Sequence, residues 1–364
     1  MQAWKFARPC VAAAALAACA GAAWALEKAA THAALGFTDS LHGAVFDPGF
    51  YVRLDLLEYR TTRYNDQDGN RAYANFGPSL APYGVPPGTP GTRGPVNLDA
   101  TGTYAQLTLF KQTETAISFL GSDTLGFGAT FLYGEQHVDL NATVPVFAAL
   151  GLSPFRDLGS NSVTSFGDTA IFPLFLGWKF GEHPPWSMTA NPLNFYVKTG
   201  SYDRNRAQNI GRNYNSWAPQ LGVTYFDKAK QEGFGAGLEA SVLFNYLRNG
   251  TNNDTHYRNG DEFFVSFGLM QWFNATTKAG ISGYYYRQIT DDTRYGVPVF
   301  SAADPQPDLF NNGVGNRAQV SGIGPTVEWF LYPHWTINLH WHHEFQSRNL
   351  PQADRVWFKA AYKF

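Results

Sequence analysis

The sequence predicts an all-β fold, a transmembrane antiparallel up-and-down β-barrel of about twelve strands preceded by a cleaved signal peptide. Three observations indicate it: an amphipathic strand that ends the chain, alternating segments of similar length, and connections that alternate between short and long. Composition agrees, because 16% of the residues are aromatic and only 15% are charged, and such barrels carry aromatic girdles at both membrane surfaces. A soluble β-sandwich or propeller is the alternative that composition alone leaves open.

Residues 1–25 are predicted to be a secretory signal peptide. Lys5 and Arg8 form its basic head, an alanine-rich apolar core follows, and Ala23-Trp24-Ala25 is a small-x-small cleavage site. We therefore expect the mature chain to begin at Leu26. Beyond this region no apolar run of about 18 residues occurs, which excludes a bundle of membrane-spanning helices.

Both cysteines, Cys10 and Cys19, lie in this leader. Cleavage after Ala25 would leave a mature chain without disulfides, thiolate metal ligands or cysteine nucleophiles. An alternative is that Leu16-Ala17-Ala18-Cys19 is a lipoprotein processing site and that Cys19 carries lipid. The formal net charge is −2, so no basic surplus suggests nucleic acid as a partner.

Residues 26–48 precede the first alternating segment, and residues 49–364 form the expected outer-membrane barrel. The segment 26–48 is neither clearly stranded nor strongly charged, and its apolar positions Leu35, Phe37 and Leu41 favour burial. We expect it either to hang in the periplasm or to fold into the lumen as a plug.

Twelve segments alternate between apolar and polar residues and are bounded by turn residues. Each has about 10 to 17 residues, which is enough for a tilted strand to cross the hydrocarbon layer. The fourth is the least regular, and its Pro173 requires a bulge or an unpaired neighbour. The segments lie near residues 50–64, 102–118, 124–140, 166–180, 193–203, 217–227, 234–248, 261–273, 277–291, 317–332, 336–349 and 355–364.

The connections sort by length. Tight turns include Leu120-Gly-Ser-Asp123, Asn274-Ala-Thr276 and Pro333-His-Trp335. The intervening gaps are long and rich in Asn, Gly and Pro, and include residues 65–101, 141–165, 204–216, 250–260 and 293–316. Short turns at one end and long loops at the other are typical of outer-membrane barrels. With both ends of the barrel periplasmic, the strand number must be even, and twelve satisfies that condition.

The faces of single segments fit an apolar exterior and a polar interior. In the eleventh segment, one face carries Ile337, Leu339, Trp341 and Phe345, and the other carries Asn338, His340, His342, Glu344 and Gln346. The last segment sets Val356 and Phe358 against Arg355 and Lys359, and it ends on Phe364. A soluble sheet would leave this last edge unpaired, whereas a barrel pairs it with the first strand.

Candidate chemistry in the sequence is sparse. The spacing of His340, His342 and Glu344 could offer a metal two imidazoles and a carboxylate, although a polar lumen wall explains it more simply. Acidic residues at the outer strand ends could bind cations that bridge lipopolysaccharide, but turn and loop roles are the favoured interpretation. These acidic residues are Asp66, Asp68, Asp203, Asp291 and Asp292.

Inward-facing tyrosines are the best candidates for a hydrophobic conduit, because their rings offer a stacking surface while the hydroxyls keep the wall wettable. Packing against a plug or against each other is the alternative role. With neighbouring polar positions they give the predicted solute path, which comprises Tyr196, Lys198, Tyr202, Tyr284, Tyr286, Gln288, His340, His342 and Glu344.

An enzyme is also considered, because outer-membrane phospholipase is a twelve-stranded barrel. Its chemistry requires a His within hydrogen-bond reach of a Ser. In that family the His and the Ser lie two positions apart on one strand. None of the nine His is followed by Ser at the second position. We therefore predict no catalytic residues, no metal and no cofactor.

Several short stretches together resemble a known family. They are Asp47-Pro-Gly-Phe-Tyr51, Arg63-Tyr-Asn-Asp-Gln-Asp-Gly69, Gly167-Asp168, Gly177-Trp178, Asn209-Ile-Gly-Arg-Asn-Tyr214, Asn245-Tyr246, Gln288-Ile-Thr-Asp291, Gly322-Ile-Gly-Pro325 and the terminal Phe364. The chain resembles the outer-membrane proteins of the phenol meta-cleavage (MetA) pathway family, sometimes grouped with sphingosine-induced outer-membrane proteins. Residues 70–100 match nothing family-wide.

The resemblance implies a barrel linked to uptake of aromatic or other hydrophobic compounds, and it carries no agreed binding residues. We expect passive uptake across the bacterial outer membrane, with lipid, lipopolysaccharide and small hydrophobic solutes as partners. The barrel-assembly machinery would bind the strand that ends at Phe364. The alternatives are a general, weakly selective porin and, less favoured, a phospholipase-like enzyme.

Overall fold

The structure is a computed structural model that describes residues 31–33, 35–81, 84–86, 88–180, 186–227, 237–331 and 333–364. The predicted signal peptide, its cleavage site and Cys19 lie outside the described residues. No helix among the described residues is long and apolar enough to cross a membrane.

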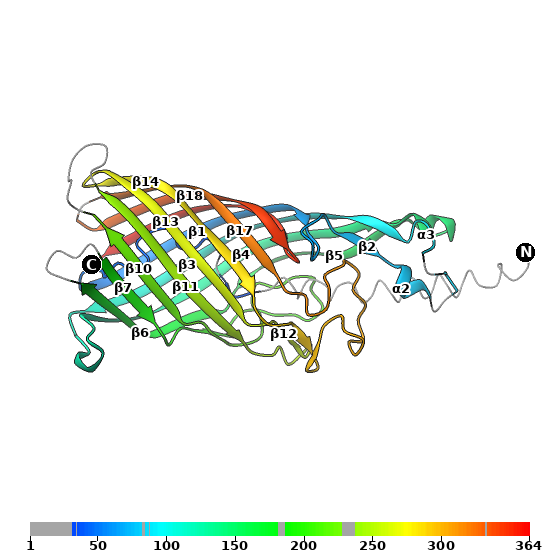
Figure 1. Ribbon diagram of the computed structural model, residues 1–364, viewed down its shortest axis with the longest axis horizontal. Coiled ribbons are helices and arrows are strands. Elements are labelled where there is room, and N and C mark those ends of the chain that lie inside the picture. The colour runs from blue at the N-terminus through cyan, green and yellow to red at the C-terminus, as the bar shows by residue number, and fades with distance from the viewer. Residues whose placement is uncertain are drawn as a thin grey trace, which may run out of the picture.

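One antiparallel sheet closes on itself, and its described strands form a barrel wall of twelve strands (Figure 1). Three of these wall strands are interrupted and consist of two consecutive strands each: β5 with β6, β7 with β8, and β9 with β10. The wall strands are β1 (Gly49–Tyr64), β3 (Arg93–Thr113), β4 (Thr124–Thr143), β5 (Phe155–Phe166) with β6 (Thr169–Phe180), β7 (Trp186–Asn191) with β8 (Phe195–Val197), β9 (Ser216–Trp217) with β10 (Gln220–Phe226), β11 (Leu238–Asn249), β13 (Glu262–Asn274), β14 (Thr277–Gln288), β17 (Gln319–Leu331), β18 (Trp335–Arg348) and β19 (Pro351–Lys363).

The last strand closes the barrel against the first, as the sequence predicts. The β1–β19 register runs from Tyr51 opposite Lys363 to Tyr64 opposite Pro351. The N–H of Phe364 also donates to the carbonyl of Phe50 at 2.9 Å. The edge that a chain end would otherwise expose is therefore paired along its whole length.

Alternation along the strands separates an apolar exterior from a polar interior. On β18, Leu339 and Trp341 are 43% and 44% exposed, whereas His340 and His342 are buried. The predicted inward position of Gln346 is wrong, because its side chain is exposed. The β17–β18 register shifts at this point, and such a bulge turns the following residue to the other face.

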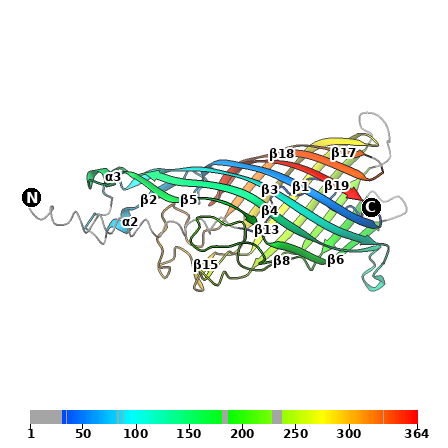
Figure 2. The same ribbon diagram turned by 180° about the vertical axis from the view of Figure 1, so that it is seen from behind.

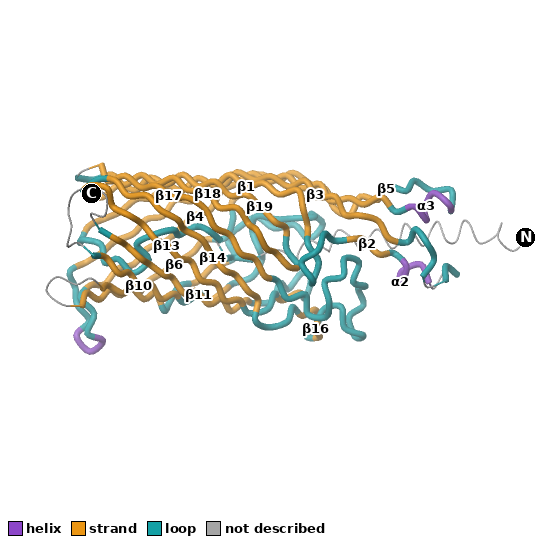
Figure 3. The backbone as a smooth tube through the Cα atoms, turned by 45° about the horizontal axis from the view of Figure 1, so that its top comes forward, coloured by secondary structure: helices purple, strands orange, loops and turns teal. Residues whose placement is uncertain are grey.

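Long loops gather at one end of the barrel, called the outer end here, and tight turns at the other, called the inner end (Figure 3). One outer loop region contains a separate small sheet of β12 (Tyr257–Arg258), β15 (Thr293–Arg294) and β16 (Val297–Pro298). The inner connection between β3 and β4 is longer than predicted, and holds the short helix η3 (Ser118–Leu120).

Two predicted outer loops are partly strand. The sequence places loops at 65–101 and 141–165, but β3 begins at Arg93, β4 continues to Thr143, and β5 starts at Phe155. Figure 2 shows these strands projecting past the barrel, together with β2 (Tyr73–Asn75), α2 (Gly77–Leu80) and α3 (Pro145–Ala149). Their inner faces bury their own apolar cluster. Val96, Leu98 and Ala100 of β3 belong to this cluster. Their burial there explains why β3 keeps an apolar inner face beyond the end of its neighbour β1.

The predicted fifth strand, 193–203, is also wrong in its bounds. The chain is extended over β7 and β8 instead, with a break after Asn191. Pro192 lies in this break, and proline cannot donate to a sheet ladder. Lys198 and Tyr202 consequently lie in the loop that follows β8 rather than on the wall. The bulge predicted near Pro173 is present, because the β4–β6 register shifts between Gly126 and Gly128.

Candidate functional site

The segment preceding β1, residues 31–33 and 35–48, contacts the inner faces of wall strands that include β7, β10, β13 and β19. Its main chain lies directly against wall glycines: a Cβ at Gly268 would be 2.0 Å from the carbonyl oxygen of Asp39, and one at Gly222 would be 2.0 Å from that of His42. The Gly43 N–H also donates to Thr224 Oγ1 at 2.8 Å. Glycine at these wall positions therefore makes room for a second layer of chain inside the barrel.

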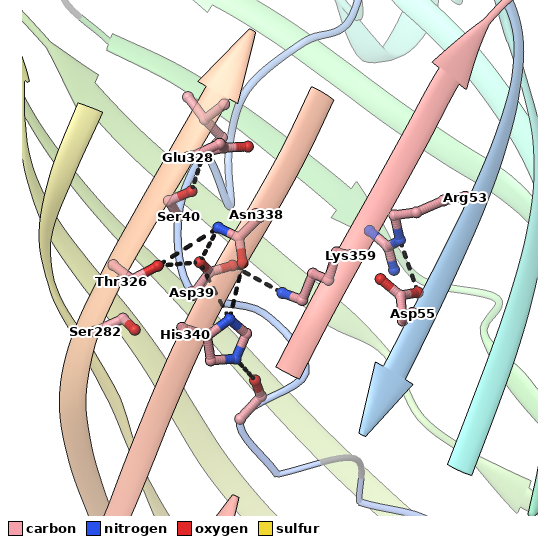
Figure 4. Close-up of polar contacts among 12 residues, drawn as sticks. Asp39, Ser40, Arg53, Asp55, Ser282, Thr326, Glu328, Asn338, His340 and Lys359 are labelled. Carbon is pink, nitrogen blue, oxygen red and sulfur yellow. Dashed lines mark hydrogen bonds and ion pairs between the residues drawn. The ribbon is translucent and has the colours of Figure 1, made fainter. Parts of the chain in front are cut away.

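Asp39 is the centre of the contact between this segment and the wall (Figure 4). Its carboxylate accepts hydrogen bonds from Lys359 Nζ at 2.8 Å, Thr326 Oγ1 at 2.6 Å and Asn338 Nδ2 at 2.5 Å. Burial alone would raise the pKa of Asp39, but Lys359, His340 and these hydrogen bonds hold it well below its ordinary value. Asp39 is thus a buried, fully paired carboxylate.

A second polar contact surrounds Lys278 of β14. Its ammonium group lies 2.7 Å from Glu239 and 2.8 Å from Glu328, all three nearly or fully buried. Ser40 donates to Glu328 at 2.9 Å and the Leu41 N–H donates to Glu239 at 2.9 Å. The segment thus supplies hydrogen bonds to a charged group that the wall has already assembled.

His32 fixes the outer end of the segment. Its ring lies 2.8 Å from Asp168 Oδ2 and 2.8 Å from Ser216 Oγ, and it stacks on Tyr196 with centroids 4.8 Å apart. Burial lowers the pKa of His32, an effect that Asp168 partly offsets. Asp168 lies in the break between β5 and β6, so this break carries one half of the contact.

His42 lies further along the segment and is also buried. Among the described residues, neither ring nitrogen has a hydrogen-bond partner. Burial lowers the pKa of His42 to about 3. The ring is therefore neutral in the docked segment, as an unpaired buried group must be.

A cavity of about 650 Å³ occupies the part of the lumen that the segment leaves free. Much of its wall is apolar and comes from β1, β3, β4 and β6. Several rings lie flat over inward-facing glycines: a Cβ would be 2.4 Å from the Tyr104 ring at Gly134, and 2.7 Å from the Phe110 ring at Gly126. Apolar residues bordering the cavity include Leu57, Leu98, Ala100, Phe110, Leu132, Val138 and Phe172.

The predicted solute-path residues divide into three groups. Tyr196 and Glu344 border the cavity. Tyr284, Tyr286, His340 and His342 face inward but do not border it, because the segment packs over them: Leu35 joins the two tyrosines in one apolar cluster, and the Gly36 carbonyl lies 2.8 Å from His340 Nε2.

The third group lies outside the lumen proper. Lys198 is exposed on the loop after β8. Tyr202 borders a separate pocket of only about 20 Å³. Gln288 donates to Asp292 at 2.7 Å at the base of the outer loops. These three residues do not border the cavity.

The metal interpretation of His340, His342 and Glu344 finds no support. Glu344 accepts from Arg355 Nε at 3.0 Å, and His342 lies 2.8 Å from Ser282 Oγ. No group of three potential metal-ligating side chains occurs anywhere in the described part of the chain.

Basic residues that border the cavity were missing from the predicted path. They are Arg53, Arg212, Arg355 and Lys359. Alternation places Arg355 and Lys359 on the inner face, so their orientation was predictable. Their access to the cavity was not, because it depends on which part of the lumen the segment fills. Arg212 reaches the cavity from a loop, for which no periodicity exists.

Comparisons with known proteins agree with this architecture. A family model described as "Putative MetA-pathway of phenol degradation" matches residues 59–360. The COG4313 outer membrane channel from Pseudomonas putida F1 has a similar structure, with a TM-score of 0.57 and 12% identity over 90% of this chain and 100% of that chain. The CymD monoaromatic hydrocarbon channel gives a TM-score of 0.40 and 8% identity over 88% of this chain and 89% of that chain. No curated protein matches the sequence significantly.

Proposed function

This chain belongs to the family of the MetA pathway of phenol degradation, and we propose that it forms a passive channel that takes up small hydrophobic or aromatic compounds such as phenolics. It is a β-barrel of the bacterial outer membrane. The CymD protein is named as a monoaromatic hydrocarbon channel, which is consistent with the proposal but does not carry it.

The observation that carries the proposal is the mainly apolar wall of the cavity. It begins at the outer end with Leu98 and Ala100, continues past Leu57 and Leu132, and reaches Phe110, Phe172 and Phe46 near the inner end. Because apolar solutes gain free energy from leaving water for such a surface, this wall offers a path that the lipopolysaccharide layer does not.

The segment 31–48 supports the same solute class. We propose that it acts as a plug that narrows the lumen, so that no wide aqueous pore remains. Twelve strands lie between the eight that pack solid and the sixteen that hold an open channel. A partly filled barrel of this size suits a solute that slides along a wall better than one that needs bulk water, which favours the proposal over a general porin.

The exterior fits contact with lipid. Large apolar side chains such as Leu54, Leu56, Phe358 and Trp341 are 38% to 44% exposed on the outer face. We further propose that the barrel-assembly machinery binds β19 and its terminal Phe364.

Growth of a deletion strain on limiting concentrations of phenolic compounds tests the function. We expect slower growth than the parent at low concentration, normal growth at high concentration, and rescue by the plasmid-borne gene. Growth on a polar carbon source such as succinate is the control and should not change. Parental growth rates on every aromatic compound at every concentration would contradict the proposal.

A further inference from the structure

Resting on the proposed function, we propose that the cavity binds solutes through an acidic head group. The substrate class would then be aromatic and alkyl carboxylates, held as anions by guanidinium and phenol donors while their apolar part lies on the wall. The hydrogen-bonding groups that border the cavity indicate this substrate class.

Arg355 on β19 supplies the first unsatisfied donors. Its Nε lies 3.0 Å from Glu344 Oε1 and 3.1 Å from the Tyr284 hydroxyl. Among the described residues, neither Nη group has a hydrogen-bond partner. The side chain is 17% exposed although it points into the barrel, so its free N–H groups face the cavity. Its guanidinium lies 4.8 Å over the ring of Tyr59, whose hydroxyl likewise has no partner in the described part of the chain.

Arg212 approaches from the outer loop between β8 and β9. Its guanidinium donates only to main-chain carbonyls, those of Thr31 at 3.3 Å and Asn209 at 2.7 Å. No carboxylate pairs with it among the described residues. Both Arg212 and Arg355 are close enough to the Tyr104 hydroxyl to interact with it electrostatically. The Tyr104 hydroxyl already donates to Gln136 at 2.8 Å, so the free donors that border the cavity here are the two guanidinium groups and the Tyr59 hydroxyl.

The carboxylates that border the cavity among the described residues are already occupied. Glu344 accepts from Arg355, Tyr284 and the Ala353 N–H. Asp168 accepts from the Gly200 and Arg212 main chain and lies against His32. Asp39 and Glu328 are paired with Lys359 and Lys278.

The formal charges of the lumen nearly cancel, so the free N–H groups decide what can bind. A carboxylate offers two acceptor oxygens in one plane, which matches the paired donors of a guanidinium. A hydrocarbon that displaces water from the guanidinium groups would leave these donors unsatisfied, which costs free energy. The cavity volume of about 650 Å³ falls in the range of small-molecule sites, and Leu57, Leu132 and Ile210 provide the adjoining apolar surface.

A third cation continues the arrangement toward the inner end. Arg53 uses Nε to bind Asp55 at 3.0 Å, and its Nη groups have no partner among the described residues. Its guanidinium lies 4.5 Å over the ring of Phe37 in the segment. An acidic head group leaving Arg355 would therefore find another free guanidinium on its way to the periplasm.

Uptake of labelled benzoate and labelled toluene at pH 7 separates this inference from the proposed function. The assay uses intact cells of the deletion strain that carry the full-length gene or a variant. The double variant Arg355→Gln with Glu344→Gln removes both members of the buried ion pair together, so no unpaired carboxylate remains. Arg212→Gln is the second variant. Arg248→Gln, on an exposed arginine of β11, is the matched control.

We expect the wild-type gene to increase the uptake of both compounds above the empty strain. Each cavity variant should reduce benzoate uptake roughly tenfold, the size expected for a lost charged hydrogen bond, while toluene uptake stays within about twofold. The control should match wild type. If the wild-type gene supported uptake of toluene but not of benzoate, the inference would be overturned and the proposed function would stand. Cavity variants that leave benzoate uptake intact would have the same meaning. Failure with both compounds would overturn the proposed function.

Discussion

Asp39 is the residue through which the segment and the wall are most tightly joined. The substitution Asp39→Asn removes the charge and leaves Lys359 buried without its partner. Breaking a buried ion pair in this way costs about 3–5 kcal/mol, so the docked segment should detach for part of the time. We expect larger and noisier single-channel currents in planar bilayers.

Asp47→Asn is the matched control for this experiment. Asp47 belongs to the same chain segment, but its side chain is 79% exposed and lies 3.7 Å from Lys363. An exposed pair of this kind contributes little, so its removal should leave the current unchanged. Equal currents from the Asp39 variant and the wild type would show that this contact does not hold the segment.

At the residue scale, the sequence predicts which way a side chain points but not what covers it. Alternation correctly places Tyr284, His340 and Glu344 on the inner face. Only Glu344 borders the cavity, because the segment covers the other two. That outcome depends on contacts between residues some 300 positions apart, such as Gly36 with His340, which no local pattern encodes.

Among the elements, β1 shows most directly that the outer face meets lipid. Leu56 is 38% exposed and pairs with Phe358 of β19 and Ala105 of β3 near mid-strand. Leu56→Lys should destabilise the barrel by about 2–4 kcal/mol, the cost of a lysine at the bilayer midplane. Urea unfolding in lipid vesicles measures this difference.

Gln106→Lys on β3 is the control for Leu56→Lys, because Gln106 borders the cavity rather than lipid. We expect a much smaller loss of stability, since the new ammonium group can remain hydrated. Similar losses for the two variants would contradict the assignment of inner and outer faces.

The segment 31–48 is the element whose docking should depend on pH. Burial lowers the pKa of both His32 and His42 in the docked state, that of His42 to about 3. A displaced segment would expose both rings to water, where they titrate near 6.5. Docking is therefore complete above about pH 6.5 and weakens as the pH falls below it, by up to about 1.4 kcal/mol per pH unit for each histidine.

Single-channel conductance recorded between pH 7.5 and 4.5 tests this dependence. We expect the wild-type conductance to rise as the pH falls, and the response of the double variant His32→Gln with His42→Gln to be flatter. A wild-type conductance that does not change over this range would contradict the coupling between these histidines and docking.

Element boundaries follow the sequence where the membrane imposes the pattern, and depart from it elsewhere. Six wall strands, the closing strand included, begin and end within a few residues of the predicted positions: β11, β13, β14, β17, β18 and β19. The outer extension of β3, β4 and β5 was predicted to be loop, because its strands are buried under a local cluster rather than by lipid. The predicted fifth strand, residues 193–203, did not include β7, because the break at Pro192 separates β7 from β8.

For the molecule as a whole, two sequence features are sufficient to predict a closed barrel: connections that alternate between short and long, and a terminal amphipathic strand. They say nothing about how the lumen is divided. The structure fills one side with the segment and leaves an apolar cavity on the other, lined by β1, β3, β4 and β6. We expect hydrophobic solutes to be taken up through that cavity.

The most direct test of this claim blocks the cavity chemically. Gln106→Cys places a thiol on the cavity wall, and Thr103→Cys places one on the outer face of the same strand. Toluene uptake by cells carrying each variant is measured before and after reaction with a bulky maleimide. We expect labelling to stop uptake only for Gln106→Cys. Unchanged uptake after complete labelling of that variant would contradict this expectation.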